Sequence, residues 1–243
     1  MSTVDEIMAF NKEFVAEKGY LKYSTDKYPD KKLAIVSCMD TRLTELLPAA
    51  LGLKNGDAKI IKNAGGVISH PFGSVIRSLL VAVFELGVET VMVIGHSNCG
   101  ARHMNADSMI KHMLNAGISQ DHIDMMHYCG IDFETWLQGF GDGEESVRET
   151  VRTIAHHPLI PETIEVRGFI IDSTTGELTP RRSLGAEHES RFCWSGKSRM
   201  FFGALLRTGA SNYWLCKQDA LFGRTCSETN VIKSIQQWSK TAQ

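Results

Sequence analysis

Short, nearly continuous runs of apolar residues recur along the first 180 positions, and each run ends at a polar or glycine-containing segment. Runs of this length without strict alternation are typical of strands that are covered on both faces of a parallel sheet. We therefore predict buried strands over residues 33–38, 58–62, 90–96 and 166–172.

Apolar residues at helical spacing lie between these predicted strands. One stripe runs from 71 to 86 and is stopped by Gly87. Residues 105–157 are mostly helical in pattern, and their last helix, over 144–157, is ended by Pro158. Strands that alternate with helices and are joined by right-handed crossovers predict an α/β fold with a parallel-core β-sheet flanked by helices.

Four polar residues precede helical stripes and are the predicted N-caps: Thr3, Thr41, Asp107 and Ser119. Thr3 is followed by Glu6 at capping-box spacing, which predicts an amphipathic helix over 4–18. Thr41 begins a short helix whose second half we expect Pro48 to disturb.

The segment 181–243 differs from the rest of the chain because it has little periodicity and contains three of the six cysteines. We divide the chain into a domain over 1–180, which includes the N-terminal helical arm, and a C-terminal extension over 181–243. The extension has no predicted place on the sheet, and its role is not readable from the sequence.

The balance of 26 Lys and Arg against 28 Asp and Glu gives a net charge of −2. A charge this small creates no field that would attract nucleic acid or an anionic membrane, so we expect neither partner. No apolar run approaches the roughly 20 residues of a membrane span, and residues 1–18 lack the apolar stretch of a secretory leader. We expect a cytoplasmic protein.

Without a leader, the six cysteines favour reduced thiols over a disulfide framework. Cys38 and Cys99 follow strand-like runs. The other four have no partner at metal-ligand spacing, and we expect them to serve in packing: Cys129, Cys193, Cys216 and Cys226.

The run over 91–94 leads directly to His96, and Cys99 follows three residues later. Ligands of open parallel sheets bind just beyond the carboxyl ends of the strands, and Cys38 stands at the end of another predicted strand. Thiolate and neutral imidazole are ligands that zinc prefers. If the two strand ends converge, Cys38, His96 and Cys99 would form a metal site. One of the four coordination positions of a tetrahedral zinc ion would remain unfilled.

Two charged residues follow Cys38 closely. Asp40 and Arg42 would be a weak ion pair if they lay on an open surface. At the rim of a metal site, the guanidinium would keep the carboxylate ionised and fixed in direction. Asp40 could then orient a nucleophile, or it could occupy the fourth metal position itself.

A small-residue segment, Asn63, Ala64, Gly65 and Gly66, follows the second predicted strand. Two adjacent glycines let the backbone approach a small ligand closely, although a simple tight turn explains them nearly as well. His70 and His103 lie near these motifs and are candidates for proton transfer, but each has an ordinary role as a surface or core histidine.

Together these motifs resemble the β-class carbonic anhydrases. The resemblance is carried by residues 37–42, 63–66 and 95–100 in this order and spacing, with 168–178 similar to the family's last strand and turn. It covers roughly residues 1–180. Each motif alone is a weak signal, whereas the three together are specific.

The resemblance implies zinc held by Cys38, His96 and Cys99, with Asp40 and Arg42 as the dyad beside it. The implied reaction is the reversible hydration of carbon dioxide to bicarbonate and a proton. In a closed form, Asp40 would replace the water on zinc and become the fourth ligand. The resemblance also implies that Asn63–Gly66 line the substrate pocket.

The resemblance further implies a homodimer or higher homo-oligomer, in which the N-terminal helix packs on a neighbouring copy. Some members have an additional bicarbonate site that involves tryptophan. No tryptophan precedes Trp136 in this chain, so we do not expect that site. Two thiolates would leave the zinc centre formally neutral and a weaker acid than one with three imidazoles, so activity should rise towards alkaline pH.

Three alternatives remain open. A carbon disulfide or carbonyl sulfide hydrolase would use a similar scaffold and metal set. A non-catalytic zinc- or bicarbonate-binding module would result if Asp40 stayed on the metal or the extension blocked entry. A purely structural zinc site is less favoured, because such sites usually have four Cys or His ligands.

Overall fold

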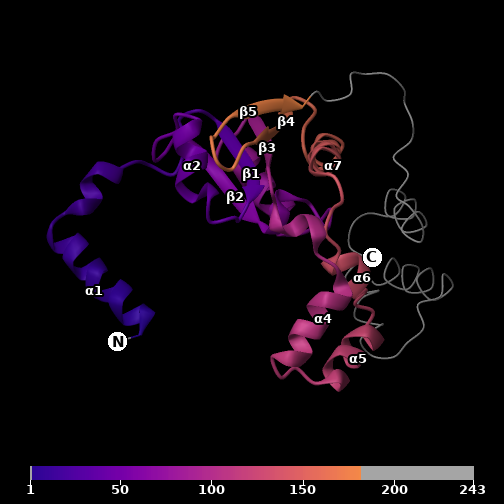
Figure 1. Cartoon of the computed structure of the whole chain (residues 1–243). Helices are drawn as coiled ribbons and strands as arrows, with labels where there is room; N and C mark the ends of the chain where they lie inside the picture. Colours follow the sequence, from indigo (N-terminus) through magenta and orange to yellow (C-terminus); the bar gives the residue numbers. More distant parts are fainter. Residues whose placement is uncertain (1, 182–243) are drawn as a thin grey trace, which may run out of the picture. The chain divides into compact units, whose positions relative to one another are not determined.

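The structure is a computed structural model that describes residues 2–181 (Figure 1). Apart from Arg181, the predicted C-terminal extension lies outside the described residues. The described strands form one sheet: β1 Leu33–Cys38, β2 Ala58–Asn63, β3 Thr90–His96, β4 Glu165–Ile171 and β5 Leu178–Arg181. All four predicted strands are present, with ends that differ from the prediction by one residue at most.

The sheet has the strand order β2-β1-β3-β4-β5. The β1 strand pairs in parallel with both β2 and β3, and β3 pairs in parallel with β4. Only β5 is antiparallel, because the tight turn after β4 returns the chain directly onto its neighbour. The predicted α/β class with a parallel-core sheet is therefore confirmed.

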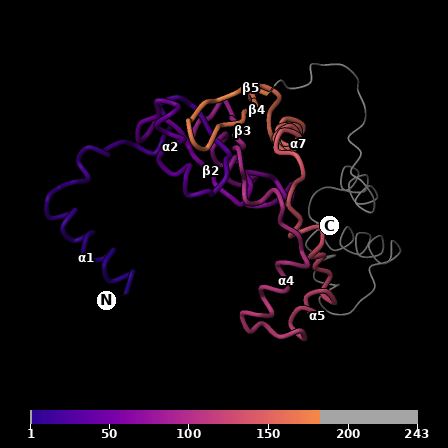
Figure 2. The backbone as a smooth tube through the Cα atoms, viewed as in Figure 1, coloured from indigo at the N-terminus to yellow at the C-terminus, as the bar shows by residue number. Residues whose placement is uncertain are grey.

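Helices occupy most of the chain between the strands (Figure 2). The α-helices are α1 Thr3–Ala16, α2 Leu43–Ala50, α3 Ser74–Phe84, α4 Ala106–Asn115, α5 Gln120–Tyr128, α6 Phe133–Leu137 and α7 Gly143–Ala155. Within residues 2–181, the structure also has three short 3-10 helices: η1 Gly19–Tyr23, η2 Ala64–Gly66 and η3 Gly100–His103. Among residues 2–181, no helix combines the length and the apolar composition that crossing a membrane requires.

Three of the four predicted caps are wrong, and the error is small each time. Ser2, not Thr3, caps α1, because Ser2 Oγ accepts from the Asp5 amide and Asp5 bonds back to the Ser2 amide. The sequence offers two overlapping cap patterns one residue apart, and the chain uses the earlier one.

The other two wrong caps are also displaced by only one or two residues. Arg42 occupies the cap position of α2 without a side-chain hydrogen bond, and the helix continues past Pro48 to Ala50. Asn105 Oδ1 accepts from the Ser108 amide at 2.8 Å, so it takes the role predicted for Asp107. Ser119 caps α5 as predicted.

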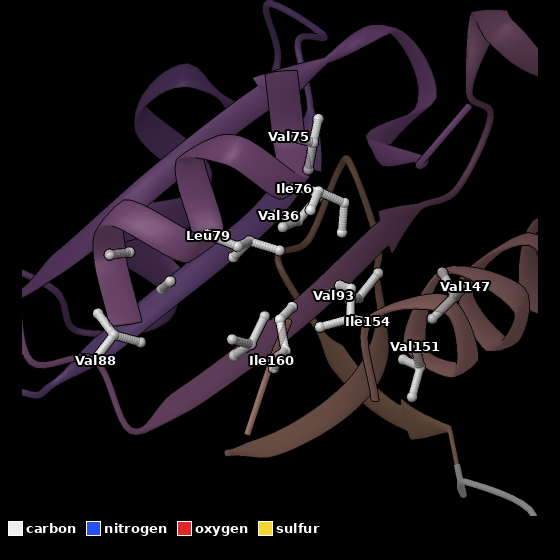
Figure 3. Packing of buried hydrophobic residues seen from close by; sticks show 13 residues of the cluster. Val36, Val75, Ile76, Leu79, Val88, Val93, Val147, Val151, Ile154 and Ile160 are labelled. Atoms are coloured by element: carbon white, nitrogen blue, oxygen red, sulfur yellow. The ribbon is translucent and has the colours of Figure 1, made fainter. Parts of the chain in front are cut away.

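The apolar core lies on both faces of the sheet. On one face, Ala34 and Val36 of β1 pack with side chains of α3 and α7, such as Leu79 and Ile154 (Figure 3). On the other face, Ile35 packs with side chains of α2. Burial of each of these apolar side chains stabilises the folded state by about 2 kcal/mol, so this packing holds β1 and β3 firmly in place.

A buried polar contact between β1 and β3 lies just before the strand ends. Ser37 is fully buried, and its hydroxyl donates to the Ile94 carbonyl at 2.9 Å. A buried hydroxyl with a partner avoids the free-energy penalty of an unsatisfied group. The contact fixes how far the ends of β1 and β3 extend relative to each other.

Candidate metal centre

Three potential metal ligands meet at the carboxyl ends of two neighbouring strands. Cys38 is the last residue of β1 and His96 is the last residue of β3, so parallel pairing brings them to the same edge of the sheet. Cys99 follows after a two-residue turn, in which Asn98 adopts a left-handed backbone with φ 52°. Asparagine tolerates that conformation better than most residues.

The donor atoms of Cys38, His96 and Cys99 all lie within 4.8 Å of one another. The two sulfur atoms are 3.8 Å apart, and all three residues are buried. His96 Nε2 is buried and, within the described part of the chain, has no hydrogen-bond partner. A buried nitrogen without a partner is unfavourable in the protein alone, and a metal ion would satisfy it. The donor set therefore fits a divalent metal such as zinc.

The orientation of the His96 ring is fixed by its other nitrogen. His96 Nδ1 lies 2.8 Å from the Ser97 carbonyl, which can only accept, so the proton belongs on Nδ1. This tautomer leaves the lone pair of Nε2 free toward the thiols. The neighbouring Cys38 sulfur is the main reason that the pKa of His96 is raised, because negative charge on it favours the protonated ring.

Backbone amides stabilise negative charge on the sulfur atoms. Burial opposes ionisation of Cys38, but the neighbouring His96 and hydrogen bonds from the amides of Asp40 and Gly65 outweigh it and lower its pKa. Burial and the neighbouring Cys38 sulfur raise the pKa of Cys99, despite a hydrogen bond from the Ala101 amide. A bound cation would favour the ionised form of both thiols.

Asp40 is held beside this cluster by Arg42. Arg42 Nε donates to Asp40 Oδ1 at 3.0 Å, and Nη2 donates to Oδ2 at 2.8 Å. The Arg42 amide adds a bond to Oδ1 at 2.9 Å. These hydrogen bonds hold the pKa of Asp40 well below its usual range. Asp40 Oδ2 lies 3.9 Å from His96 Nε2, so the ionised carboxylate borders the cluster.

Arg42 also contacts the turn between His96 and Cys99. Its Nη2 donates to the Asn98 carbonyl at 3.0 Å. One guanidinium therefore links the residues that follow β1 to those that follow β3. This bidentate contact with a carboxylate and a further acceptor suits the planar fork of arginine and cannot be matched by lysine.

The segment Asn63–Gly66 lies beside Cys38, but its residues have different contacts. Asn63 bonds the Val67 backbone in both directions, with Nδ2 donating to the carbonyl and Oδ1 accepting from the amide at 3.1 Å. Gly66 has φ 66°, and a Cβ there would lie 3.0 Å from the Cys38 nitrogen. Gly65 and Gly66 are buried, whereas Ala64 is exposed.

Other histidines and cysteines have distinct places. His70 Nδ1 accepts from the Phe72 amide at 3.0 Å in the turn before α3, and His103 ends η3. Cys129 is exposed, so the packing role expected for it is wrong, because it follows the last turn of α5 at the surface. The remaining cysteines of that group lie outside the described residues.

Sequence reasoning assigned no role to two residues near the cluster. Ser97 and Ser173 form hydrogen bonds with each other across 76 positions of the chain. Ser97 lies within the histidine motif, so its place near the site was readable. Ser173 was readable only as a turn residue after β4, since no local pattern indicates a contact over that separation.

Comparison with known proteins agrees with this arrangement. A family model described as carbonic anhydrase matches residues 33–178, a range that includes Cys38, His96 and Cys99. The Bacillus subtilis protein YtiB, named a candidate carbonic anhydrase, is 50% identical over 178 residues, which cover 73% of this chain and 95% of YtiB.

Two further proteins are similar. The crystal structure of β-carbonic anhydrase isoform I from Trichomonas vaginalis superposes with a TM-score of 0.68 at 35% identity, covering 74% of this chain and 97% of that one. A carbon disulfide hydrolase of Acidithiobacillus thiooxidans is 30% identical over 160 residues, which cover 62% of this chain and 77% of that protein.

Proposed function

This chain belongs to the β-class carbonic anhydrase family, and from that premise we propose that it is a zinc enzyme that reversibly hydrates carbon dioxide to bicarbonate and a proton. The observation that carries the proposal is the buried cluster of Cys38, His96 and Cys99 with the Asp40–Arg42 ion pair at its border. When bound, zinc supplies Lewis acidity that makes water a nucleophile near neutral pH.

In this proposal Cys38, His96 and Cys99 hold the metal, and Asp40 and Arg42 act on the nucleophile. Because Arg42 keeps Asp40 ionised, the carboxylate can only accept a hydrogen bond. It therefore favours a nucleophile that still carries a proton and repels anions that carry none. Both Asp40 oxygens are occupied by Arg42, which supports the open form of the site, in which Asp40 is not a metal ligand.

We assign substrate binding to the loop Asn63–Gly66. The support is its position, because the Gly65 amide bonds the Cys38 sulfur and Gly66 packs against the Cys38 backbone. Carbon dioxide is small and apolar, and a segment without bulky side chains lets the backbone come close to such a ligand beside the metal site. The proposed unit of function is residues 1–180, with the extension 181–243 as a separate segment.

A second activity, hydrolysis of carbon disulfide or carbonyl sulfide, is supported by the relative of that name at 30% identity. A third possibility is a module that binds zinc or bicarbonate without turnover. It would arise if Asp40 left Arg42 for the metal, or if the extension covered the site.

The deciding experiment is stopped-flow hydration of carbon dioxide against pH on protein with measured zinc content. We expect about one zinc per chain and turnover that rises through the alkaline range. Activity that is already flat and maximal at pH 6.5 would contradict the weak-acid argument. Zinc without turnover at any pH would favour the binding module, and faster turnover of carbon disulfide in competition would favour the hydrolase.

We also propose that the active form is a homodimer or larger homo-oligomer. No residue of α1 is buried in the described chain, although the helix carries the exposed apolar side chains Val4, Ile7, Met8, Phe10 and Val15. An apolar stripe of this kind marks an interaction surface. A second copy of the chain is the proposed partner.

A further inference from the structure

A group of hydrogen bonds joins the turn between β4 and β5 to the residue that follows His96. Three residues form it, Ser97, Asp172 and Ser173, and we refer to them as the serine clasp. We propose that the serine clasp positions the His96 imidazole for metal binding, with Ser173 as the positioning residue. This inference rests on the proposed function, because it concerns the same metal centre.

The link to His96 passes through one carbonyl oxygen. The Ser97 carbonyl accepts from His96 Nδ1 at 2.8 Å and from Ser173 Oγ at 3.2 Å. Two donors from different parts of the chain therefore converge on one acceptor. The direction of that carbonyl decides where the Nδ1 bond points, and hence where the Nε2 lone pair of His96 is directed.

The hydroxyl groups form a consistent set of donors and acceptors. Ser97 Oγ accepts from the Ser173 amide at 2.9 Å and lies 3.4 Å from Asp172 Oδ2, to which it can donate. Ser173 Oγ uses its own proton for the Ser97 carbonyl. The Ser97 amide donates to the Ile171 carbonyl at 3.0 Å, which extends the pairing of β3 and β4 by one residue.

The turn that carries Ser173 is itself firmly held. Asp172 Oδ1 accepts from the amides of Thr174 and Thr175, both at 2.8 Å. Ser173 is only 6% exposed, so its hydroxyl has little access to water as an alternative partner. By contrast, Asn98 on the other side of Ser97 has a left-handed backbone outside the regular ladder. The hydrogen bonds of the serine clasp therefore hold the backbone at Ser97, where the regular pairing of β3 ends.

A turn-closing role without influence on the metal is the competing explanation. It predicts that loss of the Ser173 hydroxyl lowers the stability of the protein and leaves metal binding unchanged. The positioning role predicts a change in metal retention, because metal-binding histidines depend on the partner of their second nitrogen.

The test compares Ser173→Ala with Thr174→Ala in the full chain loaded with zinc. Thr174 is exposed, and it contacts Asp172 through its amide, which alanine keeps, so this variant is a matched control. Zinc release to excess 4-(2-pyridylazo)resorcinol is followed by absorbance. We expect release about tenfold faster from Ser173→Ala, the lower end of the effect of outer partners, and near the wild-type rate from Thr174→Ala.

Equal release rates from the two variants would overturn the inference. Failure of the wild-type chain to retain any divalent metal would overturn both the inference and the proposed function, whereas retention without turnover would overturn the function alone.

A second measurement tests the link between His96 and the Ser97 carbonyl if Ser173→Ala does not fold. In the metal-free wild-type protein at alkaline pH, where the ring is neutral, nitrogen-15 NMR of His96 reports which ring nitrogen carries the proton. We expect the proton on Nδ1, as the bond to the Ser97 carbonyl requires. A proton on Nε2 would show that this carbonyl does not orient the ring and would overturn the inference.

Discussion

At the scale of single residues, Asp40 depends on one neighbour for its ionisation. Arg42 provides three hydrogen bonds to its carboxylate, two from the guanidinium and one from the backbone amide. An amide side chain at position 40 would present two donors to the Arg42 fork and lose the ion pair. The proposed metal ligands Cys38, His96 and Cys99 would be unchanged.

We therefore expect Asp40→Asn to lower kcat/KM for carbon dioxide hydration by about 100-fold while zinc stays near one per chain. Stopped-flow assays with metal analysis measure both quantities. Glu149→Gln is the control, since it removes an exposed ion pair with Arg152 on α7. A loss no larger than in the control, or a loss of zinc in Asp40→Asn, would contradict the proposed role.

At the scale of elements, η2 packs against the end of β1 only because position 66 lacks a side chain. A Cβ at Gly66 would lie 3.0 Å from two backbone atoms, the Cys38 nitrogen and the Ser37 carbonyl carbon. Backbone atoms of a buried strand cannot move aside as a flexible side chain can. The backbone at Gly66 is also left-handed, which disfavours any residue with a Cβ.

We expect Gly66→Ala to lower the free energy of unfolding of the metal-free protein by about 2–4 kcal/mol, from backbone strain and overpacking together. Gly87→Ala is the matched control, because Gly87 also has a left-handed backbone, with φ 71°, but a Cβ there would meet no neighbouring atom within 4 Å. It should lose only about 1–2 kcal/mol. If urea denaturation gave the same loss of unfolding free energy for both variants, close packing at Gly66 would make no contribution to stability.

His157 joins the end of α7 to the segment before α3. Its Nε2 donates to the Pro71 carbonyl at 2.9 Å, and its Nδ1 accepts from the Leu159 amide at 3.2 Å. The bond from the Leu159 amide requires the neutral ring, because a proton on Nδ1 would face the Leu159 amide hydrogen. Burial lowers the pKa of His157, although the Pro71 carbonyl opposes this effect.

The unfolded chain, in which a histidine pKa is about 6.5, therefore binds a proton more readily than the folded chain does. The stability that neutral His157 provides is complete above that pH and is lost as the pH falls through 6.5 toward the lower folded pKa. We expect His157→Gln, which keeps a donor for Pro71, to show a smaller fall in unfolding free energy between pH 7 and 5. Identical pH dependence in wild type and variant, both metal-free, would refute this.

At the scale of the whole molecule, the exposed apolar side chains of α1 predict association between copies. Ile7 and Phe10 are 62% and 68% exposed. We expect Ile7→Ser with Phe10→Ser to shift the mass measured by light scattering toward the monomer. Leu159→Ser, at a site 51% exposed, controls for the loss of an apolar surface group. A wild-type protein that is monomeric at all concentrations would contradict the proposal.

The sequence was most informative where physical constraints are local. The strands that end at Cys38 and His96 were predicted within a residue, because a buried parallel strand leaves an uninterrupted apolar run. Helix caps were less predictable, since Ser2 and Thr3 both fit a capping pattern and only the folded backbone selects one.

Contacts between distant parts of the chain could not be predicted from the sequence. Ser173 meets Ser97 because β4 pairs with β3, and turn chemistry alone gives no sign of that partner. Similarly, the amide of Gly65 meets Cys38 because β2 lies beside β1. Motif order indicated which side chains gather at the site, whereas the groups that orient them depend on the strand order.

The positions of two proposed ligands, Cys38 at the end of β1 and Cys99 after β3, have a consequence for folding. Cys38 and Cys99 are 61 positions apart, and α2, β2 and α3 all lie in the loop between them. An ion bound to both would act as a reversible cross-link on that loop, and a permanent link of this length restricts the unfolded chain by about 4 kcal/mol in the chain-entropy model. Metal supply would then govern how long each molecule survives proteolysis, as well as how fast it turns over substrate.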